Sequence, residues 1–353
     1  MTQKISRRAI FGCCGLLLLA LVPLGVAASN TPYLLGVVTR FLIYGLAAVS
    51  LDLVIGYGAM VSFGHAMFFG LGGYVVGIIA FHLTEAGPIF GWAGSNSALI
   101  VWPLALIVCA LAGLVFGYLA LRTRGVQFIM ITLAFGQMIY FILVSLQFYG
   151  GDDGLMISQR NVLPGLNLEN PTVFYYVCLV TLTLWTLLCI RVTNSRFGMV
   201  LQALRQSERR AINLGVAPTA YRLTAFVLSA VGTGMAGVLW ANYAGLVTPD
   251  MASWTKSGEF MAIVILGGVG TLLGPIAGAA VFLGLEQVLS SVTEHWLIFM
   301  GLILVIADMA RSEPSISSAF VAEFTRRLQG QGAALALAMP WIEQLLAEGG
   351  QTI

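Results

Sequence analysis

The chain alternates long apolar stretches with short polar connections. The stretches run roughly over 34–55, 60–82, 98–121, 126–147, 172–190 and from Arg222 to 245. A helix that crosses the hydrocarbon core of a membrane needs about 20 apolar residues. The stretches are continuous rather than alternating, which favours helices over the strands of a membrane barrel. The pattern predicts an all-α membrane protein, a polytopic bundle of about eight to ten transmembrane helices.

The region 259–292 is apolar but interrupted by glycine and proline, which are tolerated at membrane depth where the backbone is buried in protein. We predict a half-helix that folds back into a longer helix, followed by a last span at about 296–310. This path places the basic tail in the cytoplasm. The predicted domains are a transmembrane domain, 1–310, and a cytoplasmic tail, 311–353, which forms either a short interfacial helix or a loosely ordered segment.

Basic residues predict which connections face the cytoplasm. Lys4, Arg7 and Arg8 precede the first apolar run, which is either a signal peptide cleaved near residue 28 or, as we prefer because many spans follow, a retained helix with a cytoplasmic N-terminus. Arg122 and Arg124 mark a cytoplasmic turn. The 148–171 connection carries Asp152, Asp153 and Glu169 against Arg160, so it is predicted to face outward.

Two glycine-rich interruptions lie 210 residues apart, one in each half of the chain. Gly58 and Gly64 in the first have the same spacing as Gly268 and Gly274 in the second. Interrupted spans at matching places predict a transport path built from two repeat halves, and close helix packing through small residues is the alternative. The predicted path residues are Gly58, Ser62, Gly64, His65, Gly268, Gly270 and Gly274. His65 either serves the path or bonds free carbonyls, and Asp52 is expected to bond neighbouring backbone or a tyrosine.

Composition limits the possible functions. The chain is 59% hydrophobic and 9% charged, far below the charge of a soluble domain, and a net charge of +2 gives no sign of a nucleic-acid partner. The five cysteines lie in apolar runs and predict packing residues, with no metal site. No phosphate-binding loop occurs, and the two lysines, Lys4 and Lys256, do not follow glycine-rich loops. The chain therefore provides a passive path or is driven by another subunit.

The stretch 191–222, here called the docking segment, carries six arginines and one acid between apolar spans. We predict a helix from Phe197 to Asn213 or Leu214, with Gly215 as its terminator and Pro218 preventing continuation. A helix with charged and apolar surfaces suits a groove on a soluble partner. The alternative is a loop whose arginines only set topology.

The docking segment resembles the coupling segment of ABC importer permeases, in the pattern formed by Ala203, Arg205, Glu208, Ala211, Leu214 and Gly215. More narrowly, the chain resembles the LivM-type permeases of the branched-chain amino acid uptake family. The stretches 62–66, 125–135, 150–155 and 267–279 fit that family in matching order, and the resemblance covers about 33–310. The tail after 311 does not match, and Gln127 stands where relatives often carry an aromatic residue.

The resemblance implies a bacterial inner-membrane permease that pairs with a second, related permease, two cytoplasmic ATPases and a periplasmic or extracellular binding protein. It implies that Arg205, Glu208, Ala211, Leu214 and Gly215 contact an ATPase, that Asp152 and Asp153 meet the binding protein, and that the partners, not this chain, use ATP. Membrane lipid is expected as a further contact, and no nucleic acid is expected as a partner. The implied cargo is a branched-chain or related amino acid.

Three alternatives stay open. The family includes permeases for urea and short amides. A secondary carrier or channel needs no docking helix and is expected to show ionisable residues at mid-membrane. A membrane-embedded enzyme should show paired catalytic residues, yet His65, His82 and His295 are far apart in the sequence.

Overall fold

The computed structural model of the chain describes residues 19–23, 32–87, 94–292 and 296–312. Two compact units are present, 1–280 and 281–353. Most of the predicted tail, 311–353, and most of the N-terminal stretch, 1–28, lie outside the described residues. The predicted domain boundary at 310 therefore stays a prediction.

Most of the described residues are helical and only a two-stranded sheet is formed among them, which confirms the predicted all-α class. Six helices are long and apolar enough to cross a membrane. They are α2 (Pro32–Asp52, continued by the π-helical turn Leu53–Tyr57), α3 (Ala66–Phe81, continued by the π turn His82–Ala86), α4 (Ala98–Ala120), α5 (Val126–Ser145), α6 (Pro171–Thr193) and α9 (Pro218–Ala244). The shorter helices are α7 (Arg196–Gln206), α8 (Glu208–Asn213), α10 (Trp254–Gly267), α11 (Gly274–Val292) and α12 (Trp296–Ser312).

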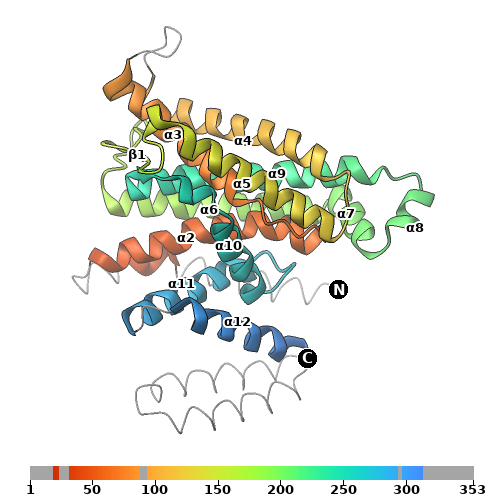
Figure 1. Cartoon of the computed structure of the whole chain (residues 1–353). Helices are drawn as coiled ribbons and strands as arrows, with labels where there is room; N and C mark the ends of the chain where they lie inside the picture. Colours follow the sequence, from red (N-terminus) through yellow and green to blue (C-terminus); the bar gives the residue numbers. More distant parts are fainter. Residues whose placement is uncertain (1–18, 24–31, 88–93, 293–295, 313–353) are drawn as a thin grey trace. The chain divides into compact units, whose positions relative to one another are not determined.

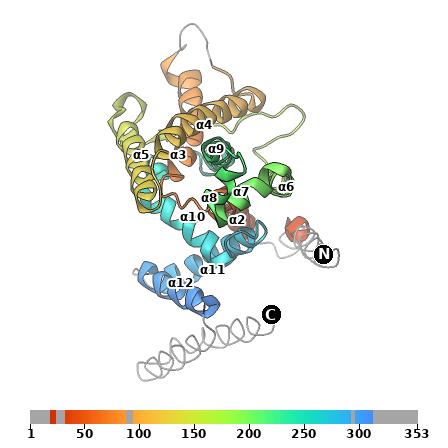
Figure 2. The same cartoon turned by 90° about the vertical axis from the view of Figure 1, so that its right-hand side faces the viewer.

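Helix α9 lies at the centre of the first unit, against α3, α4 and α2 (Figures 1 and 2). Its inward face carries small residues, so neighbouring backbones approach closely. A Cβ atom built at Gly72 of α3 would meet the carbonyl group of Gly234 in α9, with the carbonyl carbon at 2.9 Å. One at Gly113 of α4 would lie 2.8 Å from the Cβ of Ala230. Such packing replaces the hydrophobic driving force that helices lack inside a lipid bilayer.

The outward faces of α4, α5 and α6 are apolar and exposed, as expected for surfaces that contact lipid. At one end of the unit, a two-stranded antiparallel sheet pairs β1 (Leu155–Met156) with β2 (Leu246–Val247). This sheet ties the connection before α6 to the connection after α9. Short 3₁₀ turns, Gln147–Tyr149 and Pro249–Ala252, flank it. Helices α7 and α8 lie at the opposite end (Figure 1).

The predicted half-helix followed by a longer helix is confirmed. Helix α10 ends at Gly267, and the chain turns through residues 268–273, here called the second break, before α11 begins at Gly274. The left-handed φ values of 102° at Gly268 and 81° at Gly270 explain why glycine is needed there. The first break comprises residues 53–65. The expectation that the next span starts near 60 was wrong, because α3 begins only at Ala66.

The close contact between α3 and α9 generates a prediction. In Gly72→Val, the side chain meets the backbone of Gly234, which cannot move aside as a flexible side chain would. We expect a destabilisation of about 1–3 kcal/mol, the usual cost of overpacking. The readout is the thermal unfolding temperature of the detergent-solubilised protein. Gly284→Val is the control, because a Cβ there has open space around it. Equal unfolding temperatures for the two variants would contradict the assignment.

Candidate functional site

The docking segment forms two helices instead of the one predicted. Helix α7 ends at Gln206 and α8 begins at Glu208, because Ser207 between them is extended, with φ −160° and ψ 102°. The Ser207 N–H still donates to Ala203, and its carbonyl accepts the first bond of α8, from Ala211. Extended serine followed by an acid is a typical helix start. That local signal was available in the sequence at Ser207–Glu208.

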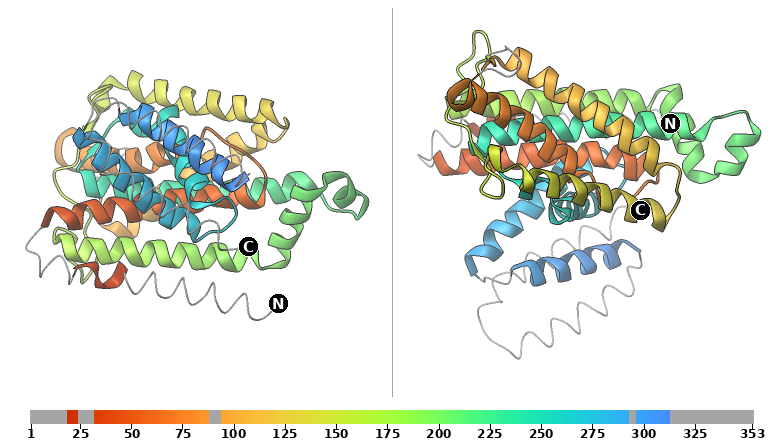
Figure 3. Two further views of the ribbon diagram at one scale, coloured as in Figure 1. Left: turned by 90° about the horizontal axis from the view of Figure 1, so that it is seen from below. Right: turned by 45° about the horizontal axis from the view of Figure 1, so that its top comes forward.

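The predicted terminator at Gly215 is confirmed. Gly215 has φ +83°, its N–H donates to Ile212, and the N–H of Val216 donates to Ala211. These two bonds form the Schellman motif, which satisfies the last carbonyls of α8. Pro218 then occupies the first turn of α9, a position that needs no N–H donor. The motif leaves Leu214 at the tip, 84% exposed. Figure 3 shows the green α7–α8 segment extending past the neighbouring helices.

The predicted coupling residues divide into two groups. Leu214 points into solvent beside the exposed Arg209, Arg210 and Ile212. Ala211 is buried, and Glu208 pairs with Arg124 at 2.9 Å and with Arg222 at 3.2 Å. The ion pairs of Glu208 therefore fasten α8 to the α4–α5 turn and to the start of α9. The exposed Arg209, Arg210 and Ile212, which the family pattern does not include, extend the surface offered to a partner.

Arg205 is an exposed residue whose side chain nevertheless reaches the bundle. Its guanidinium group donates a hydrogen bond to the carbonyl oxygen of Gly56 in the π turn of the first break. The π turn supplies this acceptor because its i→i+5 bonding disturbs the regular α-helical ladder. The last turn of α7 is thus bonded directly to an interrupted span.

Asp52 joins the two breaks. Its carboxylate accepts hydrogen bonds from the N–H of Gly270 at 2.6 Å and from that of Leu272 at 3.0 Å. The expected backbone partners are therefore found, but they belong to the second break rather than to neighbouring residues. A Cβ atom built at Gly56 would lie 2.5 Å from the Cα of Gly270. Arg205, Gly56, Asp52 and the second break form one contact group, which we call the junction.

His65 is fully buried and holds the end of the first break. Its Nδ1 lies 2.9 Å from the Ser62 hydroxyl oxygen, and its ring packs edge-on against Phe68 and Phe226. The structural interpretation of His65 expected carbonyl partners, and the observed partner of Nδ1 is a hydroxyl group instead. A Cβ atom at Gly64 would meet the carbonyl of Thr132 in α5. Ser62, Gly64 and His65 thus lie in close packing contacts.

The remaining predicted path residues lie around the same region. Gly58 and Gly268 are buried, whereas Gly270 and Gly274 are partly exposed. A Cβ atom at Gly274 would meet the carbonyl of Gly267, so the end of α10 and the start of α11 are in backbone contact. Whether these glycines border a transport path stays a prediction.

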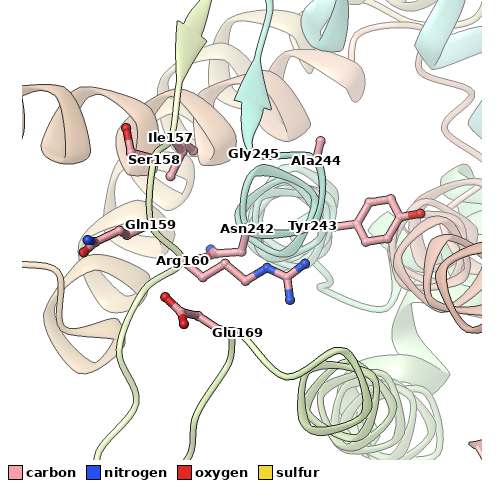
Figure 4. Close-up of a pocket in the computed structure, with 9 residues that line it drawn as sticks. All are labelled: Ile157, Ser158, Gln159, Arg160, Glu169, Asn242, Tyr243, Ala244 and Gly245. Atoms are coloured by element: carbon pink, nitrogen blue, oxygen red, sulfur yellow. The ribbon is translucent and has the colours of Figure 1, made fainter. Parts of the chain in front are cut away.

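At the opposite end of the unit, Asp152 and Asp153 are exposed on a turn flanked by Gly150, Gly151 and Gly154, all with left-handed φ. A pocket of about 330 Å³ lies at this end, lined by Ile157, Ser158, Gln159, Arg160, Glu169, Asn242, Tyr243, Ala244 and Gly245 (Figure 4). Arg160 donates to the carbonyl of Leu168 and lies over the Phe174 ring. The ring of Tyr243 extends away from Arg160, and its hydroxyl group comes close to Gly36 of α2.

Comparison with known proteins identifies the family. Residues 33–307 match the family described as the permease component of the branched-chain amino acid transport system. The chain belongs to this permease family. High-affinity branched-chain amino acid transport system permease protein LivM of Salmonella typhimurium is 26% identical over 84% of this chain and 74% of its own length. LivM of Escherichia coli has the same identity and coverage.

Other relatives extend the family. The permease protein LivH of Escherichia coli is 27% identical over 70% of this chain and 82% of its own length. The autoinducer 2 import system permease protein LsrC of Yersinia pseudotuberculosis is 29% identical over 27% of this chain and 29% of its length. No solved structure matches the chain. The resemblance inferred from the sequence is confirmed, and the chain is a multi-pass membrane transport component.

The junction predicts a specific loss of stability. Asp52→Ala leaves the N–H groups of Gly270 and Leu272 without their acceptors, at a cost of about 1–3 kcal/mol for the buried Leu272 donor and less for the partly exposed Gly270 donor. We expect a lower thermal unfolding temperature in detergent, with Asp52→Asn intermediate because the amide keeps one acceptor oxygen. Asp153→Ala, on the exposed turn, is the control and should match the wild type. The junction is disproved if Asp52→Ala and Asp153→Ala unfold alike.

Proposed function

We propose that this chain is one of two permease subunits of an ATP-driven importer for branched-chain or related amino acids in a bacterial inner membrane. Two cytoplasmic ATPases, a second related permease and a periplasmic or extracellular binding protein complete the importer. The family match supports the permease role. The names of the LivM and LivH relatives support the cargo class and a pairing of two permeases. In this proposal ATP is bound and used by the partners, and this chain is expected to bind no cofactor and to hydrolyse no ATP.

The observation that carries the proposal is the docking segment. An apolar tip, Leu214, lies at the end of a capped helix that projects from the bundle, and the same helix carries the exposed Arg209 and Arg210. An exposed apolar anchor with a charged rim is typical of a protein contact. The ion pairs of Glu208 attach the segment firmly, so a push on α8 reaches the bundle.

The junction then provides the transmission. Movement of α7 acts on Gly56 through Arg205, and movement of the first break acts on the second through Asp52. Closure of the ATPases on α7–α8 would change both breaks together and switch the path between outward and inward access. Arg205 and Glu208 in this mechanism bond within the chain, while Leu214 contacts the ATPase. The path residues proposed from the sequence, Gly58, Ser62, Gly64, His65, Gly268, Gly270 and Gly274, border or hold these breaks.

The sides of the membrane follow from the same proposal. Helices α7 and α8 face the cytoplasm with the α4–α5 turn, and the N-terminus lies on that side. The 148–171 connection then faces outward, where Asp152 and Asp153 are available to the binding protein. Binding measurements on that protein, with leucine, isoleucine, valine, urea and acetamide as ligands, would decide between amino acids and the short amides.

Leu214 gives the sharpest test of docking. Because its side chain is exposed, Leu214→Glu should leave folding unchanged and abolish ATP-dependent uptake in proteoliposomes that hold the complete importer. Leu214→Met is the matched control and should keep most activity. Co-purification of the ATPases reports docking directly. Full uptake with Leu214→Glu, or uptake by the wild type without ATPase subunits, would refute the proposal.

The junction residue Arg205 makes a second, distinct prediction. Arg205→Ala removes the bond to the Gly56 carbonyl, so it should leave ATPase docking largely intact but reduce uptake per ATP hydrolysed by more than tenfold. Arg209→Ala, an exposed arginine on the next helix, should instead weaken docking. The measurement is leucine transported per phosphate released. An unchanged ratio in Arg205→Ala would exclude this residue from transmission.

A further inference from the structure

Charged residues inside the long helices of the first unit are few. Helices α3, α4 and α5 contain none, and α2 contains two, Arg40 and Asp52. The half-helix α10 adds Lys256 and Glu259. An ionisable residue at membrane depth is expensive and therefore indicates a functional site. Asp52 belongs to the junction, and Arg40, Lys256 and Glu259 are left to explain.

These three residues gather around Tyr44, and we call the four the charged cluster. Lys256 Nζ lies 2.8 Å and 3.0 Å from the two carboxylate oxygens of Glu259 and donates to the Tyr44 hydroxyl at 3.2 Å. The Arg40 guanidinium carbon lies 5.4 Å from the centroid of the Tyr44 ring and 6.0 Å from that of Trp240. Two cations therefore contact the same aromatic ring, and one of them, Lys256, is paired with the carboxylate of Glu259.

The floor of the cluster is rigid and its rim is accessible. Tyr44 is 1% exposed, and its ring packs edge-on against Trp240, Phe260 and Phe69 at centroid distances of 5.4, 5.6 and 6.3 Å. The side chains of Lys256 and Glu259 keep 26% and 19% exposure. A structural ion pair would not need an accessible edge, whereas a binding site does. Side chains that are already fixed by packing lose little conformational entropy when a ligand binds, so the binding geometry is preorganised.

The position of the cluster along α2 relates it to the pocket on one side and to the junction on the other. Gly36, Arg40 and Tyr44 are spaced four residues apart, so they share one face of the helix. The Tyr243 hydroxyl, from the wall of the pocket, comes close to Gly36, and the Tyr243 ring also contacts Trp240. Asp52 and the junction follow about 12 Å beyond Tyr44 on the same helix. The cluster therefore lies between the pocket and the junction.

We propose that the charged cluster binds the zwitterionic head of an α-amino acid during its passage. The carboxylate is held by Arg40 and Lys256, and the ammonium group is held by Glu259 and the aromatic faces of Tyr44 and Trp240. Binding opens the Lys256–Glu259 ion pair, and each partner takes the opposite charge of the ligand. The inference rests on the proposed function, because it assigns the cargo's charged groups to residues of this chain.

The physical need for such a site comes from desolvation. A zwitterion that leaves water loses hydration at both charges, and each uncompensated charge is costly in an apolar environment. A site with charges of one sign would satisfy only half of the ligand. The cluster offers both signs, and aromatic faces add a favourable interaction with an ammonium group. The remaining side chain of the amino acid can then stay in apolar surroundings.

The test uses the complete importer in proteoliposomes with its binding protein and radiolabelled leucine. Lys256→Gln and Glu259→Gln should each lower leucine uptake more than tenfold, while stimulation of ATP hydrolysis by the loaded binding protein is retained. The double variant Lys256→Glu/Glu259→Lys restores the ion pair but reverses the site, so its uptake should stay low. Restored uptake in this double variant would overturn the proposal and assign the pair a structural role. Arg122→Gln, in the turn after α4, controls for loss of a charge, because its guanidinium group donates only an exposed hydrogen bond to the Tyr118 hydroxyl.

A milder substitution keeps the proposal testable if the glutamine variants fail to assemble. Lys256→Arg preserves the charge and the ion pair, yet it changes the geometry offered to a carboxylate. We expect the KM for leucine uptake to change several-fold, and an unchanged KM would overturn the proposal. Absence of ATP-dependent leucine uptake in the wild-type importer would refute the proposed function instead. The two failures are therefore distinguishable.

Discussion

The carboxylate of Asp52 is the interaction on which the arrangement of the described helices most depends. The first and second breaks each leave backbone groups that regular helices would satisfy, and lipid cannot replace those partners. Asp52 accepts from two N–H groups of the second break while the first break begins immediately after it. One side chain thus supplies acceptors for two backbone N–H groups of the second break and holds that break beside the first. Without this carboxylate, the hydrogen bonds that join the two breaks would be lost.

This constraint explains why the docking segment can influence distant residues. Arg205 reaches the carbonyl that the π turn exposes, so a soluble partner needs no direct access to the interior of the bundle. Attachment to the bundle and contact with a partner are therefore carried by different residues of α7 and α8. Arg205 and Glu208, through their bonds, and the buried Ala211 fasten the segment to the bundle. Leu214, Arg209 and Arg210 are exposed and available for contact.

The sequence allowed the prediction of the helical class, of a half-helix followed by a longer helix within 259–292 and of the cap at Gly215, because each depends on local signals. Continuous apolar length, glycine at left-handed positions and the glycine–proline stop can be read within a few residues. The split at Ser207 was missed although serine before glutamate is also a local signal, because apolar residues such as Leu204 and Ala211 continue on both sides of it. The partners of Asp52 and Arg205 could not be predicted, because they are 218 and 149 residues away and depend on how the helices pack. The partner of His65 is only three residues away, but a hydroxyl group stands where a carbonyl group was expected. The charged cluster could not be predicted either, because Tyr44 of α2 and Lys256 of α10 are 212 residues apart in the sequence.

The small-residue face of α9 has a mechanical consequence. Helices that touch backbone to backbone cannot rotate or slide past each other without steric overlap, because no flexible side chain lies between them to give way. Helices α3, α4 and α9 should therefore move as one rigid body throughout a transport cycle. A conformational change would then fall on the two breaks, where regular α-helical hydrogen bonding is already interrupted. Because Asp52 and Arg205 bond these breaks, the two would change together.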